Sequence, residues 1–326
     1  MYFYLTGIDY RRAPIEVRDE IYRQRKAISD FWSVNDPHGS AVLMTCNRIE
    51  IYGAARYADN AFGHISRFAE SFPNFAKYAY VKYGEAEVFR HALRLAVGLE
   101  SQIKGEGQIL EQLKRWRRDI PQGNINDLWA RAISLVQKIR AASGLDGYNS
   151  NIAALVFEDI RKKLNSKKRY EVIVIGTGKI AELIARYKSP EARLIFVAHK
   201  NYIKALALAG ESGGEALYLK DLPQLLSKAD VLICATASPH CIIRTEHLGA
   251  RTIGRGNPLH IYDLSIPRSV EPKIAQVEGV FLQNLDDLGD IFYRHNESVR
   301  EEVELASGLI EDALGIYKDV VYEKYH

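Results

Sequence analysis

The sequence predicts a multidomain protein of mixed α/β and α+β class, with an α+β N-terminal domain, a doubly wound Rossmann-type α/β domain and a long C-terminal helix. Three observations predict this fold. The 326 residues exceed the usual length of one domain and suggest about two. Short apolar segments alternate with helical segments in the second half of the chain. Residues 286–326 contain neither proline nor a strand pattern.

The composition is that of an ordinary soluble protein, with 47% apolar and 26% charged residues. No apolar run reaches the roughly 18 residues of a membrane span, and the N-terminus lacks the basic start and apolar stretch of a signal peptide. We therefore expect a cytoplasmic protein that makes no membrane contact. The net charge of +3 is too small to indicate nucleic-acid binding by itself. The three cysteines have no C-x-x-C spacing, so free thiols are expected and no metal site is indicated.

The N-terminal domain, residues 1–148, should begin with an apolar strand over Tyr2–Ile8, a charged helix and a second strand over Ala41–Met44. Glu85–Ala142 has helical spacing of its apolar residues, which predicts a helix-rich second half of this domain. Those apolar positions are Val88, Leu93, Leu95, Ala96, Leu99, Leu128, Ala132, Leu135 and Ile139.

The α/β domain, residues 149–285, should open with a helix capped near Asn149–Asn151, because asparagine and serine accept hydrogen bonds from free helix amides. Strands and helices then alternate, which is typical of a parallel sheet with helices on both faces. The expected strands are Glu171–Ile175, Leu194–Val197, Val231–Cys234 and His260–Asp263.

The last segment, residues 286–326, should form one long helix. Its apolar residues are spaced by four and three, which predicts a single seam along the helix. A helix over Asp287–Tyr325 would be roughly 58 Å long at about 1.5 Å per residue, so it needs a surface to pack against. The seam consists of Val299, Val303, Ala306, Ile310, Ala313, Tyr317 and Val320.

A glycine-rich turn follows directly after the strand that ends at Ile175. In its G-x-G-x-x-A pattern the first glycine permits a tight turn, the second lets backbone amides approach a pyrophosphate, and the small alanine lets the next helix pack on the strand. A strand, this turn and an apolar helix in that order predict dinucleotide binding, against the alternative of a plain glycine turn. The turn consists of Gly176, Thr177, Gly178, Lys179, Ile180 and Ala181.

The end of the next strand indicates which dinucleotide is bound. An NAD site would place a carboxylate there for the ribose hydroxyl, whereas this sequence has His199 and Lys200. Lys200, helped by His199, can pair with a 2′-phosphate, so NADPH is the predicted cofactor. The alternative is that Lys200 faces solvent.

Longer motifs go beyond those of a generic nucleotide-binding protein. Residues 45–52 resemble the T-C-N-R-x-E-x-Y motif of the glutamyl-tRNA reductase family, and residues 98–112 resemble its G-L-D-S and G-E-P-Q-I segments. Shorter matches occur at residues 13–18, 235–239 and 262–268. The chain thus resembles that family along most of its length. The resemblance implies the order catalytic domain, NADPH domain and spinal helix.

The resemblance implies an NADPH-dependent oxidoreductase that acts on glutamyl-tRNA(Glu). Cys46 would attack the aminoacyl ester, release the tRNA and hold the glutamyl group as a thioester. Hydride from NADPH would then give glutamate-1-semialdehyde, without a metal, in the first step of the C5 pathway to 5-aminolevulinate and the tetrapyrroles, including porphyrins. A separate glutamate-1-semialdehyde aminomutase, a further candidate partner, would convert this product.

The resemblance also implies the site residues. Cys46 is the expected nucleophile, and Arg48 beside it would lower the pKa of the thiol and grip the substrate carboxylate bidentately. His91 would be a general acid or a polar positioning group. The glutamate pocket would be formed by Thr45, Asn47, Arg48, Ser101, Glu106, Gly107, Gln108 and Gln112.

The sequence departs from the family pattern at Tyr10, Met44, Glu100 and Gly107. Glu100 and Gly107 adjoin the expected pocket, so a paralogous reductase of another acyl group or of a free carbonyl stays an alternative, as does a non-catalytic tRNA- or nucleotide-binding relative. The intact Cys46 favours thioester chemistry. The chain stops near the long helix, where the family continues into a dimerisation domain. We therefore expect a C-terminally short member that is a monomer or a weak homodimer through this helix.

Overall fold

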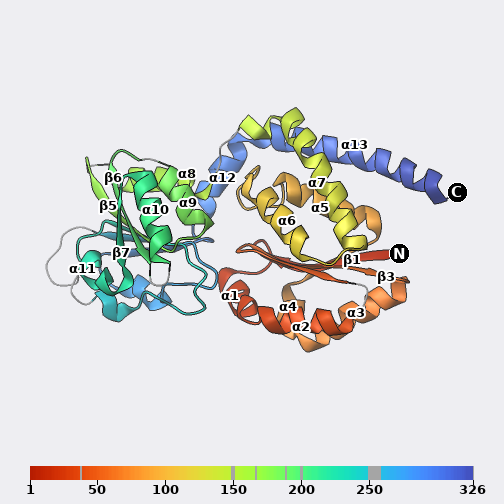
Figure 1. Cartoon of the computed structure of the whole chain (residues 1–326), viewed down its shortest axis with the longest axis horizontal. Helices are drawn as coiled ribbons and strands as arrows, with labels where there is room; N and C mark the ends of the chain where they lie inside the picture. The colour runs from red at the N-terminus through yellow and green to blue at the C-terminus, as the bar shows by residue number, and fades with distance from the viewer. Residues whose placement is uncertain are drawn as a thin grey trace. The chain divides into compact units, whose positions relative to one another are not determined.

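The chain forms two compact units, Met1–Ser150 together with Phe292–His326, and Asn151–Ile291 (Figure 1). A computed structural model describes residues 1–36, 39–147, 151–165, 167–187, 189–198, 201–248 and 258–325. The first unit contains an antiparallel sheet with helices and the second a parallel sheet with helices, so the predicted α+β and α/β classes are confirmed. The C-terminal segment Phe292–His326 belongs to the first unit by its contacts.

The first unit is built on a four-stranded sheet of order β2-β3-β1-β4. Its central strands pair antiparallel over their full length, with Asp9 opposite Arg48 at one end. Residues 45–47 join β2 to β3 at that same end, where Met44 pairs with Ile49. This geometry places Cys46 at the edge of the sheet beside the end of β1. The strands are β1 Tyr2–Asp9, β2 Ala41–Met44, β3 Arg48–Ala55 and β4 Tyr80–Tyr83.

Helices cover both faces of this sheet (Figure 1). Alternate strand residues supply two cores, so that Tyr4 packs with Trp32 on the face of α1–α4, while Leu5 packs with Leu93 on the face of α5–α7. The helix-rich segment predicted from Glu85 onward is confirmed. The helices are α1 Ile15–Arg23, α2 Arg25–Asn35, α3 Ala58–Ser71, α4 Pro73–Tyr78, α5 Glu85–Val97, α6 Gln108–Asp119 and α7 Asn124–Ser143, followed by the short η1 Leu145–Gly147.

The C-terminal segment forms two helices, α12 Gly289–Ser298 and α13 Arg300–Tyr325, so the prediction of one uninterrupted helix is wrong. The break is at Val299, three residues after Asn296, whose side chain is hydrogen-bonded to the backbone of residues 102–104. Apolar spacing could not reveal the break, because Val299 is itself buried. At about 1.5 Å per residue, α13 is roughly 39 Å long.

The predicted seam packs within the first unit. Ala306 and Ile310 of α13 join the core formed by α5 and α7, with Val303 partly buried against it. The next core residue is Leu314, whereas the predicted Ala313 is only partly buried. An ion pair between Arg90 Nε and Glu311 Oε1 at 2.9 Å adds a polar contact between α5 and α13. The neighbouring helices therefore supply the surface that the seam required. The side chains of Tyr317 and Val320 lie outside the described part of the helix.

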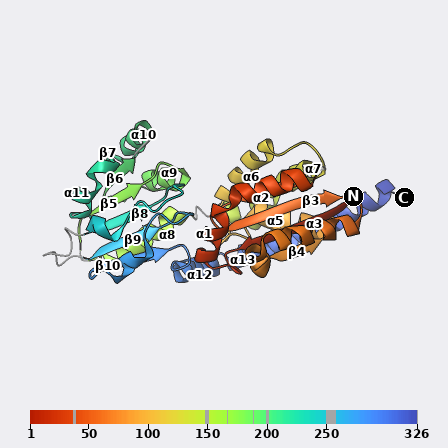
Figure 2. The same cartoon turned by 90° about the horizontal axis from the view of Figure 1, so that it is seen from below.

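The second unit contains a six-stranded sheet of order β10-β9-β8-β5-β6-β7 in which all strand pairs are parallel (Figure 2). The chain order reverses between β5 and β8, and open parallel sheets bind ligands at the carboxyl ends of such neighbouring strands. The four predicted strands are confirmed, whereas β7 and β10 were not predicted. The strands are β5 Tyr170–Ile175, β6 Ala192–Ala198, β7 Glu215–Tyr218, β8 Val231–Cys234, β9 Leu259–Asp263 and β10 Val280–Asn284.

The connections of the second unit are mostly helical. Asn151 caps the first helix, since its side chain accepts a hydrogen bond from the amide of Ala154, as its residue type predicted. The helices are α8 Ile152–Lys163, α9 Lys179–Arg186, α10 Tyr202–Ser212 and α11 Leu222–Leu226, with short η2 Leu219–Asp221, η3 Thr245–Leu248 and η4 Pro272–Gln276. Within the described residues of the whole chain, none of the helices has the length and apolarity to cross a membrane.

Candidate active site

The turn that carries Cys46 is held by a dense set of hydrogen bonds. Thr45 N donates to Arg48 O at 2.9 Å, which closes the turn. The guanidinium of the buried Arg18 donates to Cys46 O at 2.9 Å and to Asn47 Oδ1 at 3.2 Å. Asn47 N in turn donates to Thr45 Oγ1 at 3.2 Å. Arg18 therefore fixes the backbone of Cys46. Arg18 had no predicted role, although it lies in the segment 13–18 that matches the family pattern.

A buried ionic network lies beside this turn and contains both Arg48 and His91. Arg48 Nη1 is 2.6 Å from Glu50 Oε1, and His91 Nε2 is 3.0 Å from the same oxygen. Arg48 is 2% exposed and Glu50 is 0% exposed, so their charges are compensated inside the protein. Burial alone would raise the pKa of Glu50, but Arg48 and His91 hold it well below its usual value. Further donors to Glu50 are the hydroxyls of Tyr52 and Tyr80.

This network also engages Arg48. Its second terminal nitrogen donates to the backbone oxygen of Glu100, so both terminal nitrogens already bind protein oxygens. Each terminal nitrogen has a second N–H, so the predicted grip of Arg48 on a substrate carboxylate stays a prediction. Glu50 had no predicted role, although it is part of the motif at residues 45–52. Because Glu50 contacts both Arg48 and His91, it connects the cysteine turn to α5.

The electrostatic setting of Cys46 differs from the expected one. Burial raises the pKa of the Cys46 thiol to about 11, and the neighbouring Glu106 raises it further. Arg18 and Arg48 lower it, but they do not outweigh burial. Burial also raises the pKa of Glu106 to about 7, although a hydrogen bond from Ser101 and the charge of Arg48 oppose this shift. The resting group is therefore a thiol next to a carboxyl group that titrates near neutral pH.

The remaining pocket candidates lie on the loop between α5 and α6 and on the start of α6. Ser101 is buried, and its backbone oxygen accepts a hydrogen bond from the Tyr10 hydroxyl at 3.3 Å. Gln108 begins α6, just after the exposed Gly107, and its buried Nε2 has no hydrogen-bond partner among the described residues. Gln112 is one turn further along the same helix face. A buried amide donor without a partner is suited to a substrate oxygen.

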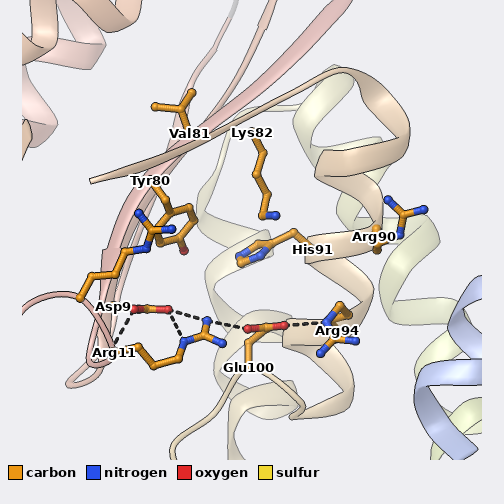
Figure 3. Close-up of a pocket in the computed structure, with 10 residues that line it drawn as sticks. Asp9, Arg11, Tyr80, Val81, Lys82, Arg90, His91, Arg94 and Glu100 are labelled. Atoms are coloured by element: carbon orange, nitrogen blue, oxygen red, sulfur yellow. Dashed lines mark hydrogen bonds and ion pairs between the residues drawn. The ribbon is translucent and has the colours of Figure 1, made fainter. Parts of the chain in front are cut away.

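His91 also lines a cavity of about 630 Å³ in the first unit (Figure 3). Of the described residues, the lining set includes Asp9, Glu100 and five cationic side chains but not Cys46. The structure thus brings Thr45, Cys46, Asn47 and Arg48 together in one turn. His91 is connected to this turn through Glu50, which contacts both His91 and Arg48.

The glycine turn in the second unit has the geometry that dinucleotide binding requires. Gly176 has φ +115°, and a Cβ there would lie 2.2 Å from Ala235 O, so only glycine fits. Gly178 precedes the first turn of α9, and Ala181 is fully buried, which lets the helix pack closely on the sheet. Gly176 and Thr177 line a cavity of about 410 Å³ together with Val197, Ala198, Asn201, Thr236 and Ser238.

The other residues proposed for the cofactor lie around this turn or outside the described part of the chain. Lys179 pairs with Glu182 on α9 at 3.3 Å, and Ile180 is partly buried in the same helix. His199 and Lys200 lie outside the described residues, so their predicted contact with a 2′-phosphate stays a prediction. Among the side chains that the structure describes, no group of three or more His, Cys, Asp or Glu residues could hold a metal ion.

The raised pKa of Cys46 predicts how its reactivity depends on pH. Since only the thiolate is alkylated, the rate of Cys46 modification by iodoacetamide should rise about tenfold per pH unit between pH 7 and 9. The substitution Glu106→Gln removes a carboxylate that raises this pKa, so the profile should shift to lower pH. Peptide mass spectrometry resolves Cys46 from the other cysteines. A plateau of the wild-type rate below pH 8 would contradict this description.

Known proteins with related sequences and structures match along nearly the whole chain. Residues 6–143 match the family of glutamyl-tRNA(Glu) reductase N-terminal domains, and residues 158–291 match the shikimate/quinate 5-dehydrogenase family. Glutamyl-tRNA reductase of Carboxydothermus hydrogenoformans is 30% identical, with 96% of this chain and 73% of that protein aligned. The Thermus thermophilus protein of the same name is 31% identical, with 97% and 80% aligned.

A solved structure gives the same result. The glutamyl-tRNA reductase from Methanopyrus kandleri is 27% identical and aligns with 98% of this chain and 80% of its own, with a TM-score of 0.50. The resemblance inferred from the motifs around Cys46 and Gln108 is thereby confirmed. The chain belongs to the glutamyl-tRNA reductase family.

Proposed function

We propose that this chain reduces the glutamyl group of glutamyl-tRNA(Glu) to glutamate-1-semialdehyde, with NADPH as reductant and Cys46 as covalent nucleophile. The observation that carries the proposal is the fixed turn of Cys46, held by Arg18 and adjoined by the buried network of Arg48, Glu50 and His91. A nucleotide-binding unit of the kind that takes a nicotinamide cofactor follows in the same chain. The product would enter the C5 pathway of tetrapyrrole synthesis.

The covalent step forms one bond and breaks another. The sulfur of Cys46 attacks the carbonyl carbon of the aminoacyl ester, the ester C–O bond breaks, and the 3′-terminal hydroxyl of the tRNA leaves with a proton. Glu106 is the candidate acceptor of the thiol proton, because it acts on Cys46 electrostatically and titrates near neutral pH. The glutamyl thioester then remains on Cys46.

The second step returns the free thiol. A bound nicotinamide supplies hydride when NADPH is present. Addition of hydride to the carbonyl carbon of the thioester, and of a proton from water to its oxygen, gives a hemithioacetal on Cys46, which collapses to the aldehyde and the thiol. Gln108, whose buried amide has no partner among the described residues, is suited to hold the carbonyl oxygen during both steps. His91 acts through Glu50 as a positioning residue, since it contacts that carboxylate at 3.0 Å.

The choice of NADPH over NADH should depend on Lys200. A charge-assisted contact to phosphate is worth on the order of 1.5–3 kcal/mol, so Lys200→Ala should weaken NADPH binding about ten- to a hundredfold. Binding of NADH, which lacks the 2′-phosphate, should stay almost unchanged. Fluorescence titration with both cofactors measures the two affinities. Equal losses for both would show that Lys200 does not contact the phosphate.

Two partner assignments accompany this proposal. The aldehyde product would be taken up by a glutamate-1-semialdehyde aminomutase. The chain would be a monomer or a weak homodimer through α13. A strong dimer is not expected, because the seam of this helix already packs against α5 and α7 within the unit.

The alternative is a reductase of a different acyl group, which the departures at Glu100 and Gly107 beside the pocket favour. Glu100 forms ion pairs with both Arg11 and Arg94, and Gly107 is exposed at the start of α6. Incubation with radiolabelled glutamyl-tRNA, with and without NADPH, distinguishes the two. We expect NADPH-dependent release of labelled glutamate-1-semialdehyde. If the labelled glutamyl-tRNA stays intact under both conditions, the protein is instead a reductase of a different acyl group.

A further inference from the structure

We propose that the cavity beside His91 binds a backbone phosphate of the tRNA substrate, and that Arg12 and Lys82 are its ligands. This inference rests on the proposed function for the identity of the nucleic acid. The cavity itself comes from the structure of the first unit, where Arg11, Arg12, Lys82, Arg90 and Arg94 line it together with two carboxylates (Figure 3).

Three of the five cations are engaged by carboxylates. Arg11 binds Asp9 at 2.5 Å and Glu100 at 2.6 Å, and Arg94 binds Glu100 at 2.6 Å. The two carboxylates that line the cavity are therefore neutralised by neighbouring arginines. Arg90 is likewise paired, with Glu87 and Glu311 outside the cavity.

The two other cations have no carboxylate partner among the residues that the structure describes. The guanidinium of Arg12 lies 5.3 Å from the centre of the Tyr80 ring, which leaves its hydrogen-bond donors open. Lys82 pairs in register with Leu5, a core residue on the face covered by α5, so its side chain is on that face. Figure 3 shows this side chain extending from β4 toward His91. Two unpaired cations thus converge on one concave surface.

These charges fit a phosphodiester better than a polyphosphate. Five cations and two carboxylates line the cavity. Two further carboxylates, outside the cavity, pair with Arg90. The net charge around the cavity is therefore slightly positive. A phosphodiester carries one negative charge and two charged oxygens. Lysine contacts such an oxygen as a point charge, and arginine contacts it through a planar fork.

The cavity also lies close to Cys46 along the chain and the sheet. Its lining residue Asp9 pairs in register with Arg48, two residues from Cys46. Its lining residue Glu100 provides the backbone oxygen that Arg48 binds. The proposed ester is carried by the last nucleotide of the tRNA, so backbone phosphates of the acceptor end must lie close to Cys46. A phosphate held by Arg12 and Lys82 would orient that end.

The test compares the double variant R12A/K82A with the matched double variant R56A/K77A. Arg56 and Lys77 are exposed, each lies over a tyrosine ring, and neither lines the cavity. Binding of glutamyl-tRNA(Glu) is measured by filter retention across a salt series. We expect R12A/K82A to weaken binding roughly tenfold at low salt and to reduce the salt slope by about 0.7, since one single-strand phosphate contact contributes about 0.7. R56A/K77A should match wild type.

A second readout separates loss of the contact from loss of the fold. Acylation of Cys46 by a phosphate-free donor, the glutamyl thioester of N-acetylcysteamine, should be equal in R12A/K82A and wild type. Reduced acylation would overturn the inference, because the substitutions would then have damaged the thiol site itself. Unchanged tRNA affinity, or a loss without a change in salt slope, would also overturn it.

Pyrophosphate distinguishes a free phosphate ligand from the tRNA backbone. If calorimetry finds that pyrophosphate binds wild type but not R12A/K82A, while tRNA affinity is equal in both, the cavity serves a free anion and the inference is wrong. The proposed function fails separately, if wild type binds glutamyl-tRNA but does not reduce it. Failure of the phosphate site would instead leave wild-type reduction intact.

Discussion

Substitution of Cys46 by serine should reduce the rate of glutamyl-tRNA reduction by roughly 10⁴-fold or more, as expected when a covalent nucleophile is lost. Serine has nearly the same size, so the turn held by Arg18 and Thr45 should persist. The measurement is steady-state release of glutamate-1-semialdehyde from labelled glutamyl-tRNA with NADPH.

Cys241→Ser is the matched control for this substitution. Cys241 is partly exposed in the second unit, where its Sγ lies 3.7 Å from Arg268 O. Its replacement should leave the rate within about twofold of wild type, because surface substitutions away from special contacts change stability by less than about 0.5 kcal/mol. A Cys46→Ser variant that retained most of the activity would show that the reaction does not pass through this thiol.

Removal of the Glu50 carboxylate should have the largest effect on stability. Glu50→Ala leaves the guanidinium of Arg48 buried without its 2.6 Å partner, and it removes the acceptor of His91. Loss of one partner of a buried ion pair lowers the free energy of unfolding by about 3–5 kcal/mol. Urea unfolding followed by tryptophan fluorescence measures this, since Trp32, Trp116 and Trp129 all belong to the first unit.

Two further variants define the cause of that loss. Glu311→Ala breaks the exposed ion pair with Arg90 and should change the free energy of unfolding by less than about 1 kcal/mol. Arg48→Met combined with Glu50→Leu removes both buried charges but leaves the hydroxyls of Tyr52 and Tyr80 and His91 Nε2 without their partner, so it should recover only part of the lost stability. Equal destabilisation by Glu50→Ala and Glu311→Ala would contradict the role given to the network.

The same network predicts the direction of the pH dependence of stability. The pKa of Glu50 is lower in the folded protein than in the unfolded chain, so the unfolded state binds the proton more readily. This stabilisation is complete above the ordinary glutamate pKa and is lost as the pH falls below it. The wild type should therefore lose more stability on acidification than the Arg48→Met, Glu50→Leu variant.

Much of the fold follows from local patterns in the sequence. Strands β5, β6 and β8 of the second unit contain continuous apolar runs, and Gly176 sits in a turn whose backbone only glycine can adopt. The cysteine turn is recognisable because Thr45, Cys46, Asn47 and Arg48 are consecutive. These features depend on neighbours in the chain, which a sequence displays directly.

The polar contacts of the site depend on tertiary structure and could not be predicted. Glu50 on β3 meets His91 on α5, and Arg48 reaches the backbone of Glu100, a residue 52 positions away. Periodicity finds the buried face of an element but does not reveal which charges will compensate one another there. The break at Val299 was missed because the apolar spacing continues across it from α12 to α13.

The most direct test of the proposed chemistry is mass spectrometry of the wild-type protein after incubation with glutamyl-tRNA(Glu) in the absence of NADPH. We expect one glutamyl group per chain, located on the peptide that contains Cys46 and removed by hydroxylamine as a thioester is. Addition of NADPH should discharge it as glutamate-1-semialdehyde. A protein that reduces glutamyl-tRNA while Cys46 never carries the glutamyl group, under single-turnover conditions, would contradict the thioester mechanism.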